Sequence, residues 1–131
     1  MVLNNDTIKV NCYTIKRIDQ NIIEISMEDN YHIELEDNIA LKEKILQIEK
    51  NTEDISFLFV SGEHTTISKE AREYSSRNRI YCKAEAVVVH KLYQRIIVNF
   101  MINFNKKSKA NRNMKIFTDR QEGLKWIQTH Y

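Results

Sequence analysis

Two short apolar runs, each followed by a segment with helical spacing, constrain the fold of this chain most strongly. Residues 55–60 read ISFLFV and residues 84–89 read AEAVVV. Such a run is typical of a strand buried on both faces, as in a parallel sheet with helices packed above and below it. Residues 114–117 are predicted to form a last strand. The alternation of strands and helices indicates an α/β layer joined by right-handed crossovers.

The first third of the chain is predicted to form strands. Residues 7–18 and 22–27 are rich in β-branched residues that partly alternate with polar ones. The segments 19–21 and 28–30 contain the Asp and Asn residues that favour turns, and residues 31–35 alternate again. We therefore expect an N-terminal β-meander ahead of the first helix.

Four segments have helical patterns. The first begins at Asp37, which we expect to be its N-cap, and apolar residues recur after it every three or four positions. Ser68 is expected to cap the second helix. The third spans residues 91–104, which contain no helix breaker, and the last begins at Thr118 or Asp119. At 131 residues, the chain is expected to form a single domain, residues 1–131.

This order of elements resembles the STAS fold of the anti-sigma-factor antagonists, and more narrowly a family of small bacterial STAS-like proteins. The resemblance covers about residue 55 to the end, and the first fifty residues match only in their strand-strand-helix order. It implies a non-enzymatic regulatory or protein-interaction module. The matching residues are Phe57-Leu58-Phe59-Val60, Ile67-Ser68, Glu70-Ala71-Arg72, Tyr74, Ala84, Ala86-Val87-Val88, Arg95, Asn99-Phe100, Lys115-Ile116-Phe117-Thr118-Asp119 and Trp126.

Two polar positions near the second helix are candidate sites. Ser68 places a hydroxyl at a helix N-terminus, where phosphorylation would add about −1.5 to −2 charges beside a favourable dipole. The alternative is that Ser68 only caps the helix. His64, next to Glu63 in the preceding loop, could act as an acid or base, because imidazole titrates near neutral pH. A small hydrolase that uses His64 is therefore a third functional hypothesis.

The segment 91–104 has more apolar residues than one face against a sheet requires. A second copy of the chain, a small apolar ligand or a lipid surface would cover the surplus, unless the helix is buried all round in its own domain. We predict an interaction surface at Ile97, Val98, Met101 and Ile102.

Charge is unevenly divided along the chain. Residues 1–65 hold 6 Lys/Arg against 13 Asp/Glu, a net −7, while residues 66–131 hold 14 against 5, a net +9. The basic run near residue 110 is predicted to be an anion-attracting patch, with a solvated loop as the alternative, since it lacks the aromatic residues that stack on bases. Its members are Lys106, Lys107, Lys109 and Arg112.

Several classes of function are not expected. Two glycines and no proline leave no glycine-rich phosphate loop, and the cysteines and histidines have no metal-ligand spacing. Cys12 and Cys82 are expected to be reduced and buried. No export signal or membrane span is recognisable, so a cytoplasmic protein is expected.

We therefore expect a homodimeric interaction module without a cofactor, a metal or a nucleic-acid partner. A carrier of a small apolar or lipid-like ligand is the alternative.

Overall fold

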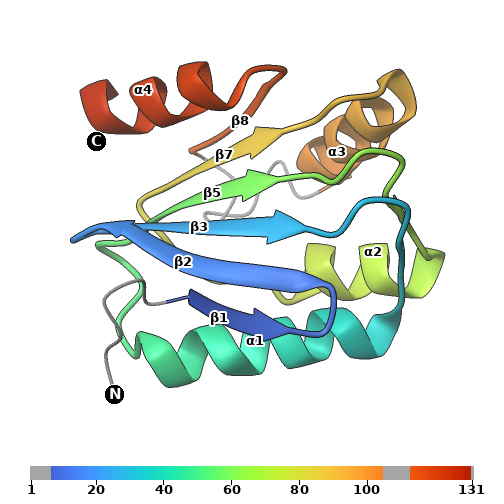
Figure 1. Ribbon diagram of the computed structural model, residues 1–131, viewed down its shortest axis with the longest axis horizontal. Coiled ribbons are helices and arrows are strands. Elements are labelled where there is room, and N and C mark those ends of the chain that lie inside the picture. Colours follow the sequence, from blue (N-terminus) through green and yellow to red (C-terminus); the bar gives the residue numbers. More distant parts are fainter. Residues whose placement is uncertain (1–6, 105–112, 131) are drawn as a thin grey trace.

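The computed structural model describes residues 7–104 and 113–130, with the side chains of residues 100–104 and 130 excepted. The strands are β1 (Thr7–Val10), β2 (Tyr13–Asp19), β3 (Ile22–Met27), β4 (His32–Ile33), β5 (Ser56–Val60), β6 (Thr66–Ile67), β7 (Ala84–Val88) and β8 (Met114–Phe117). The helices are α1 (Leu35–Ile48), α2 (Lys69–Arg77), α3 (Leu92–Phe104) and α4 (Arg120–His130). The predicted α/β class is confirmed (Figure 1).

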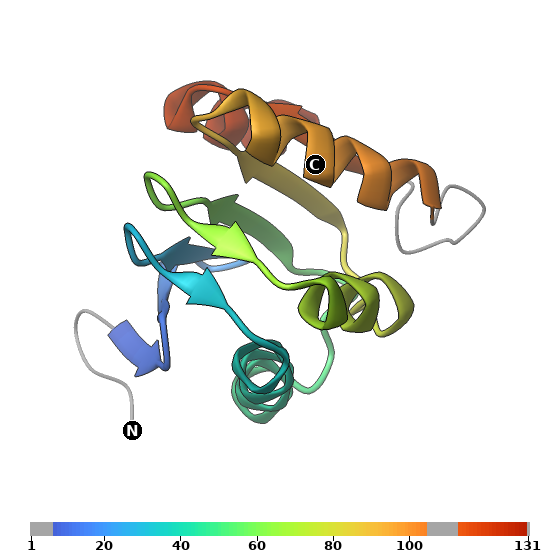
Figure 2. The ribbon, with the colours of Figure 1, turned by 90° about the vertical axis from the view of Figure 1, so that its right-hand side faces the viewer.

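A six-stranded mixed sheet forms the centre of the molecule, in the order β1-β2-β3-β5-β7-β8. The first three strands are antiparallel neighbours, and β3, β5, β7 and β8 run parallel. Each parallel strand is added on the same side of the one before it. Because β-α-β crossovers are nearly always right-handed, such an order places α1, α2 and α3 on one face of the sheet. Figure 2 shows α4 on the side of the sheet away from α1 and α2.

Each face of the sheet has its own apolar core, because side chains alternate along a strand. On the α1 and α2 face, Phe57 packs with Ile25 of β3 and Ile45 of α1. On the other face, Leu58 and Val88 pack against Ile127 of α4. The interpretation of residues 55–60 and 84–89 as strands covered on both sides is therefore correct.

The predicted N-terminal strands differ from the structure in two places. The expected strand 7–18 is two strands, because Asn11 has a φ of 55° and turns the chain between β1 and β2. The segment 31–35 does not extend the meander. Its residues His32–Ile33 form β4, which pairs in parallel with β6 in a separate two-stranded sheet.

The start of α1 was placed too late. The N-cap is Glu34, and Asp37 is the third residue of the helix. Asp37 is buried, and its carboxylate accepts hydrogen bonds from the backbone N of Glu34 at 2.8 Å and from the Tyr31 hydroxyl at 3.0 Å. It also accepts one from Asn11 Nδ2 at 2.8 Å, which ties the helix to the β1–β2 turn.

Ser68 is confirmed as the N-cap of α2, and its Oγ accepts a hydrogen bond from the backbone N of Ala71 at 3.1 Å. In residues 7–104 and 113–130, no helix has both the length and the apolar character needed to cross a membrane.

Candidate functional site

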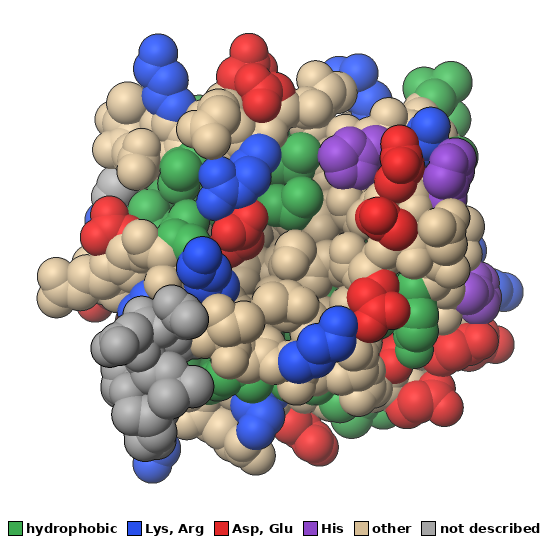
Figure 3. All heavy atoms as spheres, in the orientation of Figure 1, with side chains coloured by type: hydrophobic (Ala, Val, Ile, Leu, Met, Phe, Trp, Pro, Cys, Tyr) green, Lys and Arg blue, Asp and Glu red, His purple; other side chains and the backbone are tan. Residues whose placement is uncertain are grey.

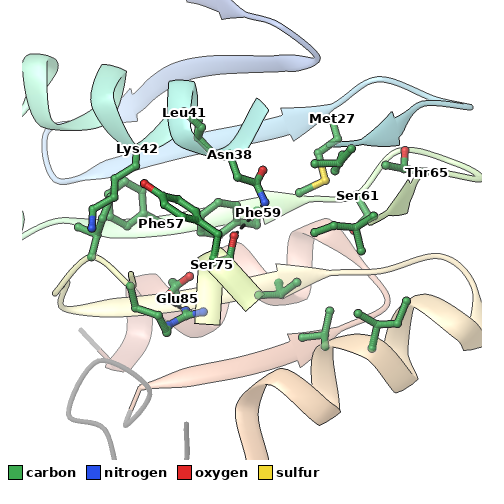
Figure 4. A pocket seen from close by; sticks show the side chains of 18 of the residues that line it. Met27, Asn38, Leu41, Lys42, Phe57, Phe59, Ser61, Thr65, Ser75 and Glu85 are labelled. Carbon is green, nitrogen blue, oxygen red and sulfur yellow. Dashed lines mark hydrogen bonds and ion pairs between the residues drawn. The ribbon is translucent and has the colours of Figure 1, made fainter. Parts of the chain in front are cut away.

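A cavity of about 190 Å³ lies between the sheet and the three helices on its first face (Figure 4). Strands β3, β5 and β7 supply its floor, and residues of α1, α2 and α3 supply its walls. Its apolar lining includes Met27, Ile33, Leu41, Ile45, Phe57, Phe59, Ile67, Ile80, Val87, Ile97, Val98 and Met114. This lining suits a ligand whose body is mostly apolar.

The pairing of β5 with β7 determines which side chains lie toward each end of the cavity. Phe57 of β5 is paired with Glu85 of β7, and Phe59 is paired with Val87 two residues further on. The charged side chain therefore lies at the end where these strands begin. Figure 4 shows Glu85 and Lys42 toward one end of the cavity, and Ser61 toward the other.

Two amide side chains that line the cavity, those of Asn38 and Gln94, already have several hydrogen-bond partners. Asn38 accepts a hydrogen bond from the Tyr13 hydroxyl, and its Nδ2 donates to Ser75 Oγ at 2.9 Å and to the Ala71 carbonyl at 3.3 Å. Gln94 is equally saturated. Its Nε2 donates to the carbonyls of Gly62 and Thr65, and its Oε1 accepts from two backbone N–H groups at the start of α3. These amides hold elements together and leave little bonding capacity for a ligand.

The charged groups that line the cavity are less completely paired. Arg79 and Glu85 form an ion pair whose side chains are only 9% and 8% exposed. Arg79 Nη2 also donates to the Met114 sulfur at 3.5 Å, a weak acceptor, and Nε has no partner among the described residues. Lys42 of α1 has no ion-pair partner within the described part of the chain. The cavity therefore has two cationic groups and one carboxylate.

Ser68 is half-buried at the N-terminus of α2 and does not line the cavity. Its hydroxyl accepts the hydrogen bond from Ala71, and its backbone N donates to the Ile33 carbonyl at 2.9 Å. The cap role is shown, and modification of the hydroxyl stays a prediction.

His64 lies in the loop after β5 with a φ of 62°, and its side chain is exposed. It does not line the cavity. His32 of β4 and His90, which follows β7, are also exposed. Figure 3 shows histidines at the end of the molecule where the parallel strands finish, with acidic side chains beside them. Among the described residues, no group of three His, Cys, Asp or Glu side chains is placed to hold a metal ion.

The predicted interaction surface on α3 is divided by the structure. Ile97 and Val98 are half-buried and line the cavity. Leu92 and Ile96 instead face outward, with exposed fractions of 73% and 58%. The side chains of Met101 and Ile102 lie outside the described residues, as does the whole basic patch of Lys106, Lys107, Lys109 and Arg112.

Both cysteines are free thiols, Cys12 buried and Cys82 half-buried. Burial, together with the nearby Asp37 carboxylate, raises the pKa of Cys12 to about 12. Burial also raises the pKa of Cys82, with Glu85 adding to the effect. Neither thiol is therefore activated as a nucleophile near neutral pH.

Sequence reasoning missed the Arg79–Glu85 pair and the role of Gln94. One signal was available for the pair, since Glu85 interrupts the otherwise apolar run AEAVVV. A charge inside a strand buried on both faces requires a buried counter-charge. The choice of Arg79 depends on how the chain returns from α2 to β7, and no sequence pattern showed that.

Comparison with known proteins adds a family assignment. No curated protein and no solved structure matches the chain. The chain belongs to the family described as a domain of unknown function, DUF7793, whose model matches residues 16–131.

Proposed function

We propose that this domain is a non-enzymatic module that binds a small, mostly apolar ligand in the cavity between the sheet and helices α1, α2 and α3. The observation that carries the proposal is the cavity itself. It is lined by Phe57, Phe59, Val87 and Ile97 where close packing would normally leave no room for a water molecule. The cavity is partly open to solvent, and a concave, mostly apolar wall of this kind suits an apolar molecule.

The size of the cavity limits the ligand. A cavity of about 150 Å³ in another protein binds benzene. The 190 Å³ here fits a single ring with a few further atoms. A long acyl chain, with several times as many carbons as benzene, is too large, so we favour a ring-sized ligand over a lipid.

We expect the module to act in the cytoplasm, where its two free cysteines stay reduced.

Titration with toluene, followed by the amide NMR spectrum, tests this proposal. Chemical-shift changes should concentrate on the residues that line the cavity. Ile97→Phe places a larger side chain in the cavity lining and should reduce these changes. Ile96→Phe makes the same substitution on the exposed side of α3 and should leave them intact. Amide shift changes that toluene causes all over the surface, or that are the same in Ile97→Phe as in the original protein, would contradict ligand binding in this cavity.

A second candidate function is protein interaction of the STAS-like type. Leu92 and Ile96 lie one helical turn apart on α3, and both are largely exposed. Together they form an apolar patch that a second copy of the chain could cover, and phosphorylation at Ser68 would add a regulatory charge. The resemblance to STAS domains supports this role. Light scattering should then give a mass near twice 15.6 kDa that falls to the monomer value in Leu92→Ser/Ile96→Ser.

A further inference from the structure

We propose that the ligand is a small organic acid bound as its carboxylate, with the acid group toward Arg79 and Lys42 and the apolar body against Phe57 and Phe59. This inference rests on the proposed function, because it names the chemical class of the ligand in the same cavity. Three observations support it: the state of the polar groups, the balance of charge and the size of the cavity.

The first observation concerns the bonding capacity that remains in the cavity. Asn38 and Gln94 use their donors and acceptors on protein partners. Among the described residues, Lys42 has no ion-pair partner and Arg79 Nε has no hydrogen-bond partner. Both groups are donors only. A ligand group that pairs with Lys42 and Arg79 must therefore be an acceptor.

The second observation concerns charge. Arg79 and Lys42 contribute two positive charges to the cavity lining, and Glu85 contributes one negative charge. A buried charge is costly unless it is paired, and Glu85 pairs with only one of the two positive charges. One ligand carboxylate makes the site neutral, whereas a cationic ligand would add to the excess and a neutral ligand would leave it unchanged. Arginine also suits a carboxylate geometrically, because its planar group offers several parallel N–H donors.

The guanidinium can receive a second carboxylate with a small adjustment. In this structure Nε is enclosed, and Nη2 serves both Glu85 and the Met114 sulfur. Because a thioether is a weak acceptor, its contact with Nη2 is easily given up for an oxygen. A ligand carboxylate that takes this place draws the guanidinium toward the cavity and keeps the pair with Glu85.

The third observation is that the charged end of the cavity lies beside its aromatic wall, at a distance that one small ligand can span. The aromatic rings of Phe57 and Phe59 lie 6.0 Å apart between centroids and line the cavity beside Val87. Glu85 lies next to Phe57 on the neighbouring strand, so the charged end is directly beside the aromatic wall. A ring carrying a carboxylate, such as benzoate, spans these two regions within the space available.

Benzoate and benzamide form a matched pair of probes, since they have the same shape and differ in charge. We expect benzoate to bind about tenfold more tightly, the effect of one hydrogen bond to a charged group. Lys42→Met should reduce this preference. Lys44→Met, on the same helix but outside the cavity lining, should leave it unchanged. Isothermal titration calorimetry on the full chain measures both affinities.

Removing the buried pair tests the role of Arg79 without leaving an unpaired charge. Replacement of a buried ion pair by apolar residues of similar volume is often neutral for stability. The double variant Arg79→Met/Glu85→Met should therefore stay folded, still bind toluene and show a reduced preference for benzoate, because Lys42 remains. Equal affinities for benzoate and benzamide in the original protein would overturn the inference and leave the proposed function standing. Failure of toluene, benzamide and benzoate alike to bind would overturn both.

Discussion

Replacement of Asp37 tests whether a single buried carboxylate fixes the start of α1. In Asp37→Ala, the Glu34 N–H, the Tyr31 hydroxyl and the Asn11 amide all lose their acceptor. A hydrogen bond to a charged group contributes about 1.5–3 kcal/mol. Because Asn11 is exposed and Tyr31 half-buried, both regain water, and the sum is reduced. We expect a loss of about 2–4 kcal/mol in the free energy of unfolding.

Urea denaturation followed by circular dichroism measures this loss. Glu36→Ala removes an exposed carboxylate from the same helical turn and should change the free energy of unfolding by less than about 0.5 kcal/mol. A second readout is the titration of Tyr31. Its hydrogen bond to Asp37 raises the pKa of this tyrosine to about 12, so in Asp37→Ala the pKa should return toward 10.0. If Asp37→Ala costs no more than Glu36→Ala, the carboxylate does not anchor the helix.

Two further predictions concern glycine and alkaline pH. A Cβ at Gly62 would clash with the Glu28 carbonyl oxygen and with Thr65 Oγ1, so Gly62→Ala should destabilise the fold by about 1–3 kcal/mol. Gly123→Ala should instead stabilise it by about 0.5–1 kcal/mol, because the new Cβ meets Leu58 and Phe117 at an ordinary 3.4 Å and alanine favours a helix. Thermal unfolding should show a lower melting temperature for Gly62→Ala and a higher one for Gly123→Ala. Melting temperatures that change in the same direction and by the same amount would contradict this prediction. The pKa of Cys12 is raised from 9.0 to about 12, so folding favours the protonated thiol. Its contribution to stability is complete below pH 9.0 and is lost as the pH rises toward 12, so Cys12→Ala should flatten the fall in the free energy of unfolding over that range.

Local chemistry was the reliable part of the sequence analysis. Ser68 was correctly predicted as a cap because a hydroxyl before a helix acts on atoms three residues away. Asp37 has the same local character, but Tyr31 and Asn11 give its carboxylate more partners at the third helical position than it would have as the cap. The position of Asp37 in the helix therefore depends on contacts with Tyr31 and Asn11, which the spacing of apolar residues in α1 does not reveal.

The candidate site was less predictable because it depends on long-range arrangement. The surplus of apolar residues in 91–104 predicts that something besides the sheet covers α3, and this stays a prediction. Ile97 and Val98 of the predicted interaction surface line the cavity together with Gln94, whereas Ile96 is exposed. Gln94 fixes this rotation through its bonds to the Gly62 and Thr65 carbonyls, which lie about thirty residues earlier.

The position of α4 has a consequence for synthesis of the chain. Among the described residues, this helix is the one that covers Leu58 and Val88 on the second face of the sheet, yet it follows the described strands in the sequence. Until the ribosome has finished α4, the apolar side chains on the second face of the sheet are exposed to water and to neighbouring nascent chains. We expect this interval to be the period of greatest aggregation risk, when a chaperone would have most to protect.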